Sequence, residues 1–172
     1  MKLRNLVFLA VGFGFTALVA LPLRAIKERT YASDEISLHS GTVKAEIDGT
    51  YYPMKVSFWY DGLQTDAPYR LRIFYRPTDS SSHKVALIRI TITSGGVSHP
   101  LPVRANLGTW ERDPSGNPMY MVGFLDVPVT TPDVVAEVEL LLDGTIASAK
   151  LSLSRSTTTK VVHSGFESVM GI

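Results

Sequence analysis

The sequence lacks cysteine altogether and carries almost no net charge. A chain without cysteine has no disulfides, no thiolate metal sites, no cysteine nucleophile and no lipid-modified cysteine. The 17 Lys and Arg residues stand against 16 Asp and Glu residues, for a formal net charge of +1. Proteins that bind nucleic acids use a basic excess to displace counterions from phosphates. We therefore expect no DNA or RNA partner.

The chain is also too short for two large domains. Its 172 residues match one ordinary domain with a short appendage. The hydrophobic content of 45% is too high, and too regularly patterned, for a disordered chain.

One long uncharged run, residues 6–23, stands near the N-terminus between basic residues. As a helix it would be about 27 Å long, close to the roughly 30 Å hydrocarbon core of a bilayer. The apolar region of a cleavable signal peptide is usually shorter, about 7 to 15 residues. We expect a hydrophobic helix that is retained as a single-span anchor. A cleaved signal peptide is the alternative, because Leu18-Val19-Ala20 ends on a small residue.

Helical periodicity is absent from Glu35 onward, where apolar residues alternate with polar ones at period two. Eight or nine short strands in this length predict an all-β fold, an antiparallel sandwich of immunoglobulin-like or Greek-key type. The predicted strands are residues 36–47, 50–60, 69–76, 84–93, 98–105, 119–127, 133–142, 145–154 and, as a ninth, 158–163.

These patterns divide the chain into three parts. Residues 1–30 form the anchor or signal peptide with its basic flank, and residues 31–155 form the β-sandwich domain. Residues 156–172 form a tail that is rich in threonine at first and then mixed with apolar residues. We expect this tail to add an edge strand or to dock on a partner.

Two Asp-Gly pairs predict β-hairpins with type I′ turns, which need positive φ at both central residues. With a turn at Asp143-Gly144, paired residue numbers sum to 287, one face becomes wholly apolar, and Glu137 faces Lys150. A turn at Asp48-Gly49 pairs residues whose numbers sum to 97. The turn geometry accounts for both aspartates without a catalytic role.

The segment 69–76 supplies the candidate binding residues. Its alternation places Arg70, Arg72, Phe74 and Arg76 on the outward face. Pairing with residues 53–60 across a loop at 61–68 would add Lys55 and Trp59. Such a face without carboxylates would suit a phosphate, a sulfate or a carboxylate, or it would offer an aromatic platform to a sugar or a partner side chain. The alternative is a solvated face whose arginines stack on the aromatic rings and pair with acids from elsewhere.

A second candidate is Trp110, in the irregular stretch 106–118. A tryptophan in a polar loop on a rigid scaffold is a plausible anchor for a ligand or partner. The alternative is that Trp110 closes one end of the sandwich.

Catalytic and metal-binding signatures are absent from the sequence. No nucleophile-elbow, Walker or zinc-protease motif occurs, and the predicted strands bring no Ser, His and Asp together. His83 and His99 are expected roughly 25 to 30 Å apart along extended chain, too far to share an ion. We expect no catalytic residue, no metal and no cofactor.

The sequence therefore favours a non-enzymatic, membrane-anchored extracytoplasmic β-sandwich that acts as an interaction or assembly subunit of an envelope protein complex. It would contact the membrane through residues 6–23 and otherwise bind protein partners. The alternative is a secreted or periplasmic module that binds a glycan or an anionic group, and an enzyme of unknown class is a third reading.

Overall fold

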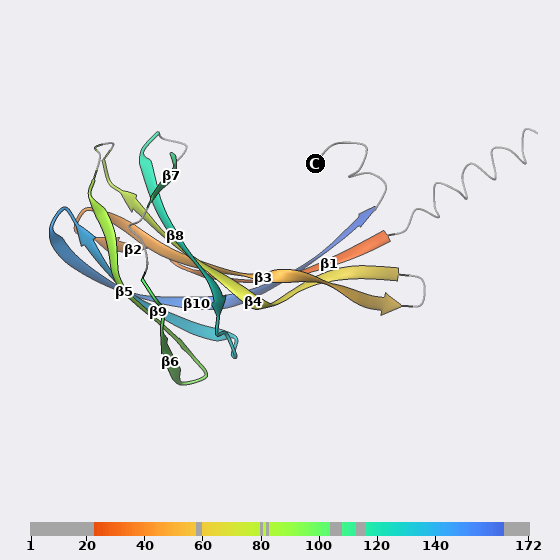
Figure 1. The fold of residues 1–172 in the computed structure, drawn as a ribbon. Coiled ribbons are helices and arrows are strands. Elements are labelled where there is room, and N and C mark those ends of the chain that lie inside the picture. The colour runs from red at the N-terminus through yellow and green to blue at the C-terminus, as the bar shows by residue number, and fades with distance from the viewer. Residues whose placement is uncertain are drawn as a thin grey trace, which may run out of the picture. The chain divides into compact units, whose positions relative to one another are not determined.

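A computed structural model describes residues 23–57, 60–79, 81, 83–103, 108–112 and 116–163. The described chain is all-β, as predicted (Figure 1). Its strands are β1 Leu23–Ser33, β2 Ile36–Leu38, β3 Gly41–Ser57, β4 Tyr60–Pro77, β5 Val85–Ser94, β6 Val97–Pro100, β7 Gly108–Arg112, β8 Pro118–Val127, β9 Asp133–Leu142 and β10 Thr145–His163.

The predicted N-terminal helix, residues 6–23, lies outside the described residues except for Leu23. Within the part of the chain that the structure describes, no helix has the length and apolar character to cross a bilayer. Strand β1 includes residues 23–30, which the sequence pattern assigned to the anchor and its basic flank. Residues 156–163 of the predicted tail continue β10.

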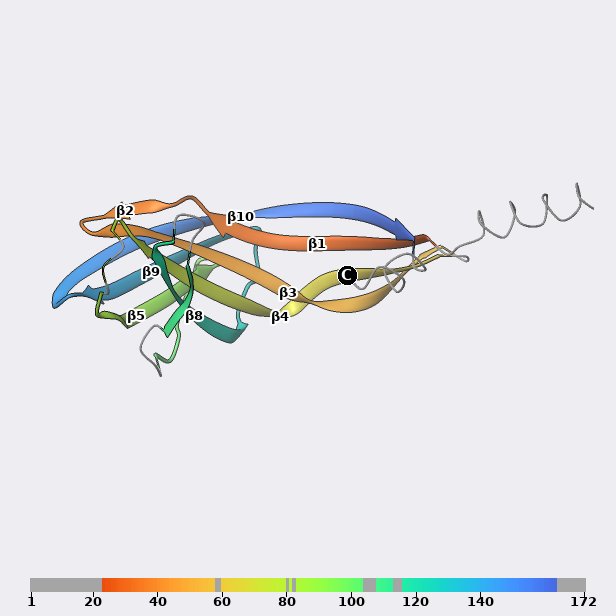
Figure 2. The same ribbon diagram turned by 90° about the horizontal axis from the view of Figure 1, so that it is seen from above.

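The strands form one sheet that does not close on itself. Its order is β6-β5-β9-β10-β1-β3-β4-β8-β7, with β2 beside β3. Figure 1 shows β5, β9 and β10 as neighbours, and Figure 2 shows β10 beside β1. The sheet is mixed rather than wholly antiparallel, because β1 and β4 pair in parallel through residues 25–27 and 62–64.

Contacts divide the chain into two compact units. The larger unit comprises Glu28–Tyr52 and Thr65–Thr157. The smaller unit comprises Met1–Lys27, Pro53–Gln64 and Thr158–Ile172. The main hydrophobic core lies entirely in the larger unit.

This core forms because alternate residues of seven strands point to the same interior. One group of buried side chains comes from β1, β3, β4 and β8, and another comes from β5, β9 and β10. The largest fully buried side chains are Tyr75, Ile47, Leu71, Ile73, Ile90, Ile92, Leu140, Leu142, Leu151, Leu153, Val43 and Val134. Burial of apolar surface on this scale is the main force that holds a domain of this size together.

The Asp143-Gly144 hairpin is confirmed in every pair of its ladder, from Thr145 opposite Leu142 to Leu153 opposite Val134. Asp143 has φ 49° and Gly144 has φ 90°, the positive values that a type I′ turn requires.

The predicted turn at Asp48-Gly49 is wrong, because β3 runs straight through it from Gly41 to Ser57. Gly49 does not have positive φ. A Cβ built on Gly49 would lie 2.8 Å from both the amide nitrogen and the carbonyl oxygen of Asp66. Glycine at 49 therefore serves the close approach of the β3 and β4 backbones, which is its other common role in a strand.

The loop predicted at 61–68 is wrong for the same reason. The chain does not reverse at Gly49, and residues 60–77 form the single strand β4, which is a neighbour of β3 in the sheet. The hydroxyl of Thr50 donates to the carbonyl oxygen of Pro68 at 3.0 Å, so residues near 50 lie beside residues near 68.

Strand β5 pairs with β9, and its register shifts between Leu87 and Arg89. Ile90 and Ile92 are buried. Ile88 is 41% exposed, although simple alternation would place it on the same face as Ile90. A β-bulge adds one residue to one strand and so reverses the direction of the side chains beyond it.

The contact at Gly49 predicts that Gly49→Ala destabilises the protein by about 1 to 3 kcal/mol, the usual cost of forcing extra atoms into a packed site. The matched control is Gly123→Ala, because the nearest atom to a Cβ there is a carbonyl oxygen at 3.8 Å. Thermal unfolding of the full chain in detergent, followed by circular dichroism, measures both variants. Equal melting temperatures for the two would contradict the close approach.

Candidate functional site

The predicted binding residues are only partly brought together. Arg70, Arg72 and Phe74 lie on β4 in the larger unit, whereas Lys55 lies on β3 in the smaller unit. Trp59 lies outside the described residues. Trp110 belongs to β7 rather than to a loop, and only its backbone is described.

Arg72 is engaged by two carboxylates of β3. Its Nη2 lies 3.3 Å from Glu46 Oε2 and also contacts Asp48 Oδ2. The sequence predicted a face without carboxylates, and this expectation is wrong. Because β3 continues through Asp48 instead of turning there, both acids lie alongside β4.

Phe74 is buried rather than displayed, with an exposed fraction of 6%. The Nζ of Lys44 lies 5.2 Å from the centroid of its ring, and the Cζ of Arg72 lies 5.7 Å from it. These distances suit cation–π contacts. Lys44 also pairs with Glu46 at 2.9 Å. Around Phe74 the face therefore matches the alternative given by the sequence analysis, in which cations cover an aromatic ring and pair with nearby acids.

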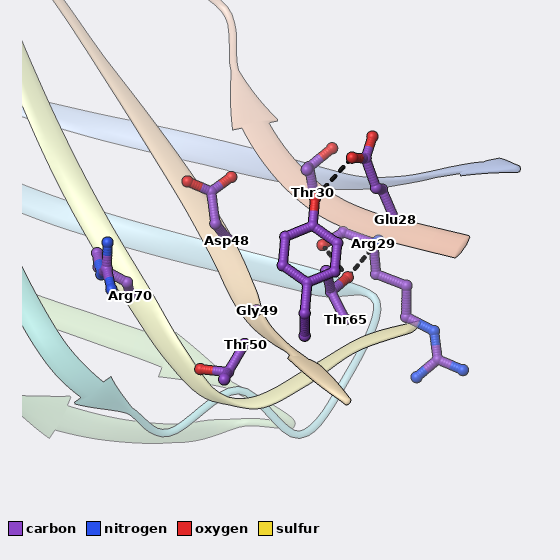
Figure 3. A pocket seen from close by; sticks show the side chains of 9 residues that line it. Glu28, Arg29, Thr30, Asp48, Gly49, Thr50, Thr65 and Arg70 are labelled. Carbon is purple, nitrogen blue, oxygen red and sulfur yellow. Dashed lines mark hydrogen bonds between the residues drawn. The ribbon is translucent and has the colours of Figure 1, made fainter. Parts of the chain in front are cut away.

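A pocket of about 520 Å³ opens beside this face, between β1, β3 and β4 (Figure 3). Figure 3 shows Glu28 and Thr30 on β1, Asp48 and Thr50 on β3, and Arg70 on β4. The complete lining is Glu28, Arg29, Thr30, Asp48, Gly49, Thr50, Tyr51, Thr65 and Arg70.

The pocket lies where β1 changes its neighbour. Residues 30–32 of β1 pair with β3, and residues 25–27 pair with β4. Between these ladders, the Thr65 hydroxyl accepts the amide N–H of Arg29 at 2.6 Å and contacts the Arg29 carbonyl oxygen at 3.2 Å. Thr65 is buried and satisfies backbone groups that the interrupted ladder leaves unpaired.

Three charged groups of the pocket wall already have partners. The Tyr51 hydroxyl donates to Glu28 Oε1 at 2.6 Å, Arg29 pairs with Asp66 at 3.4 Å, and Asp48 contacts Arg72. The hydrogen bond to Glu28 is the largest of the effects that raise the pKa of Tyr51 to about 12. Tyr51 therefore stays neutral at physiological pH and keeps donating to Glu28.

Arg70 differs from these groups. It is exposed, and its side chain has no hydrogen bond or ion pair with the residues that the structure describes. A guanidinium group presents several N–H donors in a planar fork. Arg70 therefore gives the pocket an unused donor group of positive charge.

A second cluster, centred on His83, was not predicted from the sequence. His83 Nδ1 lies 2.6 Å from Asp143 Oδ2, and His83 Nε2 lies 2.7 Å from Asp79 Oδ1. The Tyr120 hydroxyl accepts the His83 amide N–H and donates to the His83 carbonyl oxygen, both at 3.0 Å. The cluster thus joins the segment between β4 and β5, the β9–β10 turn and β8.

The missed cluster has one signal in the sequence. The β9–β10 turn places Asp143 directly after β9, and antiparallel pairing of β5 with β9 brings Val85 opposite Leu142. That register carries His83, two residues before Val85, to the turn. The strand pattern alone does not say that β5 pairs with β9.

The cluster contains a serine, a histidine and an aspartate, but it is unsuited to nucleophilic catalysis. The Ser81 hydroxyl lies 3.1 Å from His83 Nε2 and 2.6 Å from Asp79 Oδ1. A general base needs an unprotonated nitrogen facing the nucleophile. Nε2 instead lies closer to Asp79 Oδ1, at 2.7 Å, and the same carboxylate accepts the serine hydroxyl. In the described part of the chain, no group of acidic and histidine side chains fits a metal ion.

The two carboxylates shift the titration of His83. The hydrogen bond to Asp143, followed by the one to Asp79, raises the pKa of His83 above its ordinary value of 6.5. Hydrogen bonds from Ser81 and then His83 lower the pKa of Asp79 from 3.8 to about 2. Bonds from His83 and from the Lys84 amide lower the pKa of Asp143.

These shifts predict how stability depends on pH. A raised histidine pKa stabilises the folded state below pH 6.5, and this contribution is lost as the pH rises through the folded pKa. The melting temperature should therefore fall as the pH rises above 6.5, and His83→Gln should flatten this fall. Asp143→Asn keeps a residue suited to the positive φ of the turn and should weaken the dependence. A wild-type slope in His83→Gln would exclude the cluster as its source.

The burial of Phe74 gives a separate prediction. Phe74→Ala should cost about 3 to 5 kcal/mol, as truncation of a buried aromatic residue usually does. Arg70→Ala, on the same face of β4, should leave stability nearly unchanged because Arg70 is exposed and unpaired among the described residues. Urea unfolding measures both changes. A small effect of Phe74→Ala on the free energy of unfolding would contradict the burial of this ring.

Comparison with known proteins identifies no relative of this chain. No family model matches it, and no curated protein or solved structure does. Its function is therefore inferred from its own contacts and charges.

Proposed function

We propose that this protein is a non-enzymatic interaction subunit of an envelope protein complex, held at the membrane by residues 6–23 with its β domain outside the cytoplasm. The uncharged run of residues 6–23 between basic residues supports the membrane location. The observation that carries the interaction role is the edge of β5 before Thr91, which no strand among the described residues pairs with; it is called the free edge below.

The free edge follows from unequal pairing on the two sides of β5. On one side, β9 pairs with β5 from Val85 to Ser94. On the other side, β6 pairs only with Thr91 to Ser94 among the described residues. The carbonyl oxygen of Ile90 accepts the amide N–H of Leu101 at 3.0 Å, so the free edge ends there. An edge of this kind is a template for a strand from another chain.

An apolar row lies on the outer face next to this edge. Ala86 pairs with Leu141, and Leu141 pairs with Ile146 on the far side. Ile146 is 62% exposed, and Ile88 is exposed at the bulge. Farther along the same face, ion pairs Arg89–Glu139 and Lys150–Glu137 cover the strands. Exposed apolar side chains beside an open edge favour the addition of an extended apolar peptide.

The occupant is a strand of a different protein rather than a second copy. Residues 84–90 carry no acid and two cations, Lys84 and Arg89, of which Arg89 also pairs with Glu139. Two copies paired through β5 would bring these like charges together, whereas an apolar segment flanked by acids complements them.

We also propose that the larger unit is a two-layered, immunoglobulin-like sandwich, which is supported by the shared core of its two groups of strands.

Photocrosslinking from the free edge tests the proposal. The full chain, expressed in its own cells, carries p-benzoylphenylalanine in place of Ile88, or in place of Ser148 as an exposed control on the same outer face. We expect one discrete adduct with a second envelope protein from position 88 and none from position 148. Ile146→Lys should reduce this adduct severalfold.

Other outcomes would contradict the proposal. An adduct of two copies of this chain would establish a homodimer at the edge instead of a complex with another protein. Equal labelling from positions 88 and 148, or no adduct from position 88, would remove the free edge as a docking site.

A further inference from the structure

We propose that the pocket between β1, β3 and β4 binds a sugar that carries a carboxylate, with Arg70 as the anchor for the charge. This inference is independent of the docking edge on β5, because it rests on other strands and other residues. The pocket has a volume of about 520 Å³, which falls within the range of small-molecule binding sites.

The first step is the charge. Among the charged residues of the wall, Glu28, Arg29 and Asp48 have partners in the protein. Arg70 has none among the described residues. An exposed guanidinium fork binds a carboxylate or a phosphate through paired N–H donors.

The second step distinguishes a carboxylate from a phosphate. The wall also contains the carboxylates of Glu28 and Asp48. A phosphate dianion would meet about twice the repulsion from these groups that a single negative charge meets. The pocket therefore favours a monoanion such as a carboxylate over a phosphate dianion.

The third step concerns the remainder of the ligand. The side chain of Tyr51 is half exposed, with 50% of its surface accessible, and its hydrogen bond to Glu28 fixes the ring. Such a ring packs against the apolar face of a sugar. Thr50 donates its own proton to Pro68, so its oxygen remains free to accept one from a ligand hydroxyl. A second hydroxyl, on Thr30, also lines the pocket.

Together these groups match a ligand with one negative charge, several hydroxyls and a flat apolar face. A uronic-acid residue of a glycan has all three. An acidic peptide shares the carboxylate but lacks the ring hydroxyls, so Thr30 and Thr50 would have less to bind. The sugar is therefore the ligand that uses the whole wall.

Calorimetric titration of the full chain in detergent tests the inference. The probes are a disaccharide ending in glucuronate, its neutral glucose counterpart, inorganic phosphate and a short acidic peptide. We expect the glucuronate probe to bind most tightly. Arg70→Gln should weaken its binding by at least about tenfold, as expected for loss of a charge-assisted contact. Arg70→Lys, which keeps the charge without the planar fork, should fall between the two.

The matched control is Arg155→Gln, another exposed arginine without a partner among the described residues, which should bind as the wild type does. Tyr51→Ala should weaken both the charged and the neutral sugar. Tighter binding of phosphate or of the acidic peptide would overturn the assignment to a sugar. Equal binding by Arg70→Gln, or no heat at millimolar glucuronate, would overturn the site. Neither result bears on the crosslink from position 88.

Discussion

The backbones of β3 and β4 meet at Gly49 and Asp66, and the arrangement of the neighbouring surface depends on this contact. Only a residue without a side chain fits there, because a Cβ would lie 2.8 Å from the Asp66 backbone. The contact keeps β3 extended through a dipeptide that usually turns. As a result Glu46 and Asp48 stay on the sheet, where they engage Arg72, while Arg70 in the adjacent pocket has no partner among the described residues.

His83 plays a comparable role at another place in the larger unit. Its ring joins two carboxylates that are far apart in sequence, Asp79 and Asp143, and its backbone is held by the Tyr120 hydroxyl. One side chain thus connects the β4–β5 segment to a turn and to the core tyrosine of β8. Both ring nitrogens face carboxylates, so neither is directed at a nucleophile alone as a catalytic histidine would need.

The two Asp-Gly pairs show how much of the fold the sequence can predict. At Asp143-Gly144, five of the ten ladder pairs join two apolar residues, and the predicted register is correct. At Asp48-Gly49, the apolar residues move from odd positions up to Ile47 to even positions from Tyr52, so the local pattern favours a turn over the continuous strand that forms. The backbone of Asp66 decides between them, and this contact between strands is not visible in the local sequence.

The candidate site shows the same limit. Alternation along 69–76 correctly separates the buried side chains from the arginines. It does not show which strand lies beside β4, so the pairing of Arg72 with β3 acids and the burial of Phe74 were missed. The His83 cluster was missed because it depends on β5 joining β9, a choice that core packing makes between strands of similar pattern.

The hydroxyl of Tyr120 has a consequence for the size of whatever joins the β5 edge. It occupies both backbone groups of His83 at one end, and the amide of Leu101 occupies Ile90 at the other. The backbone between them offers about six residues, or roughly 20 Å at the rise of a β-strand. The fold therefore limits the paired length of the strand that we propose to add at this edge. Such a strand can pair along this window and must leave the sheet beyond it.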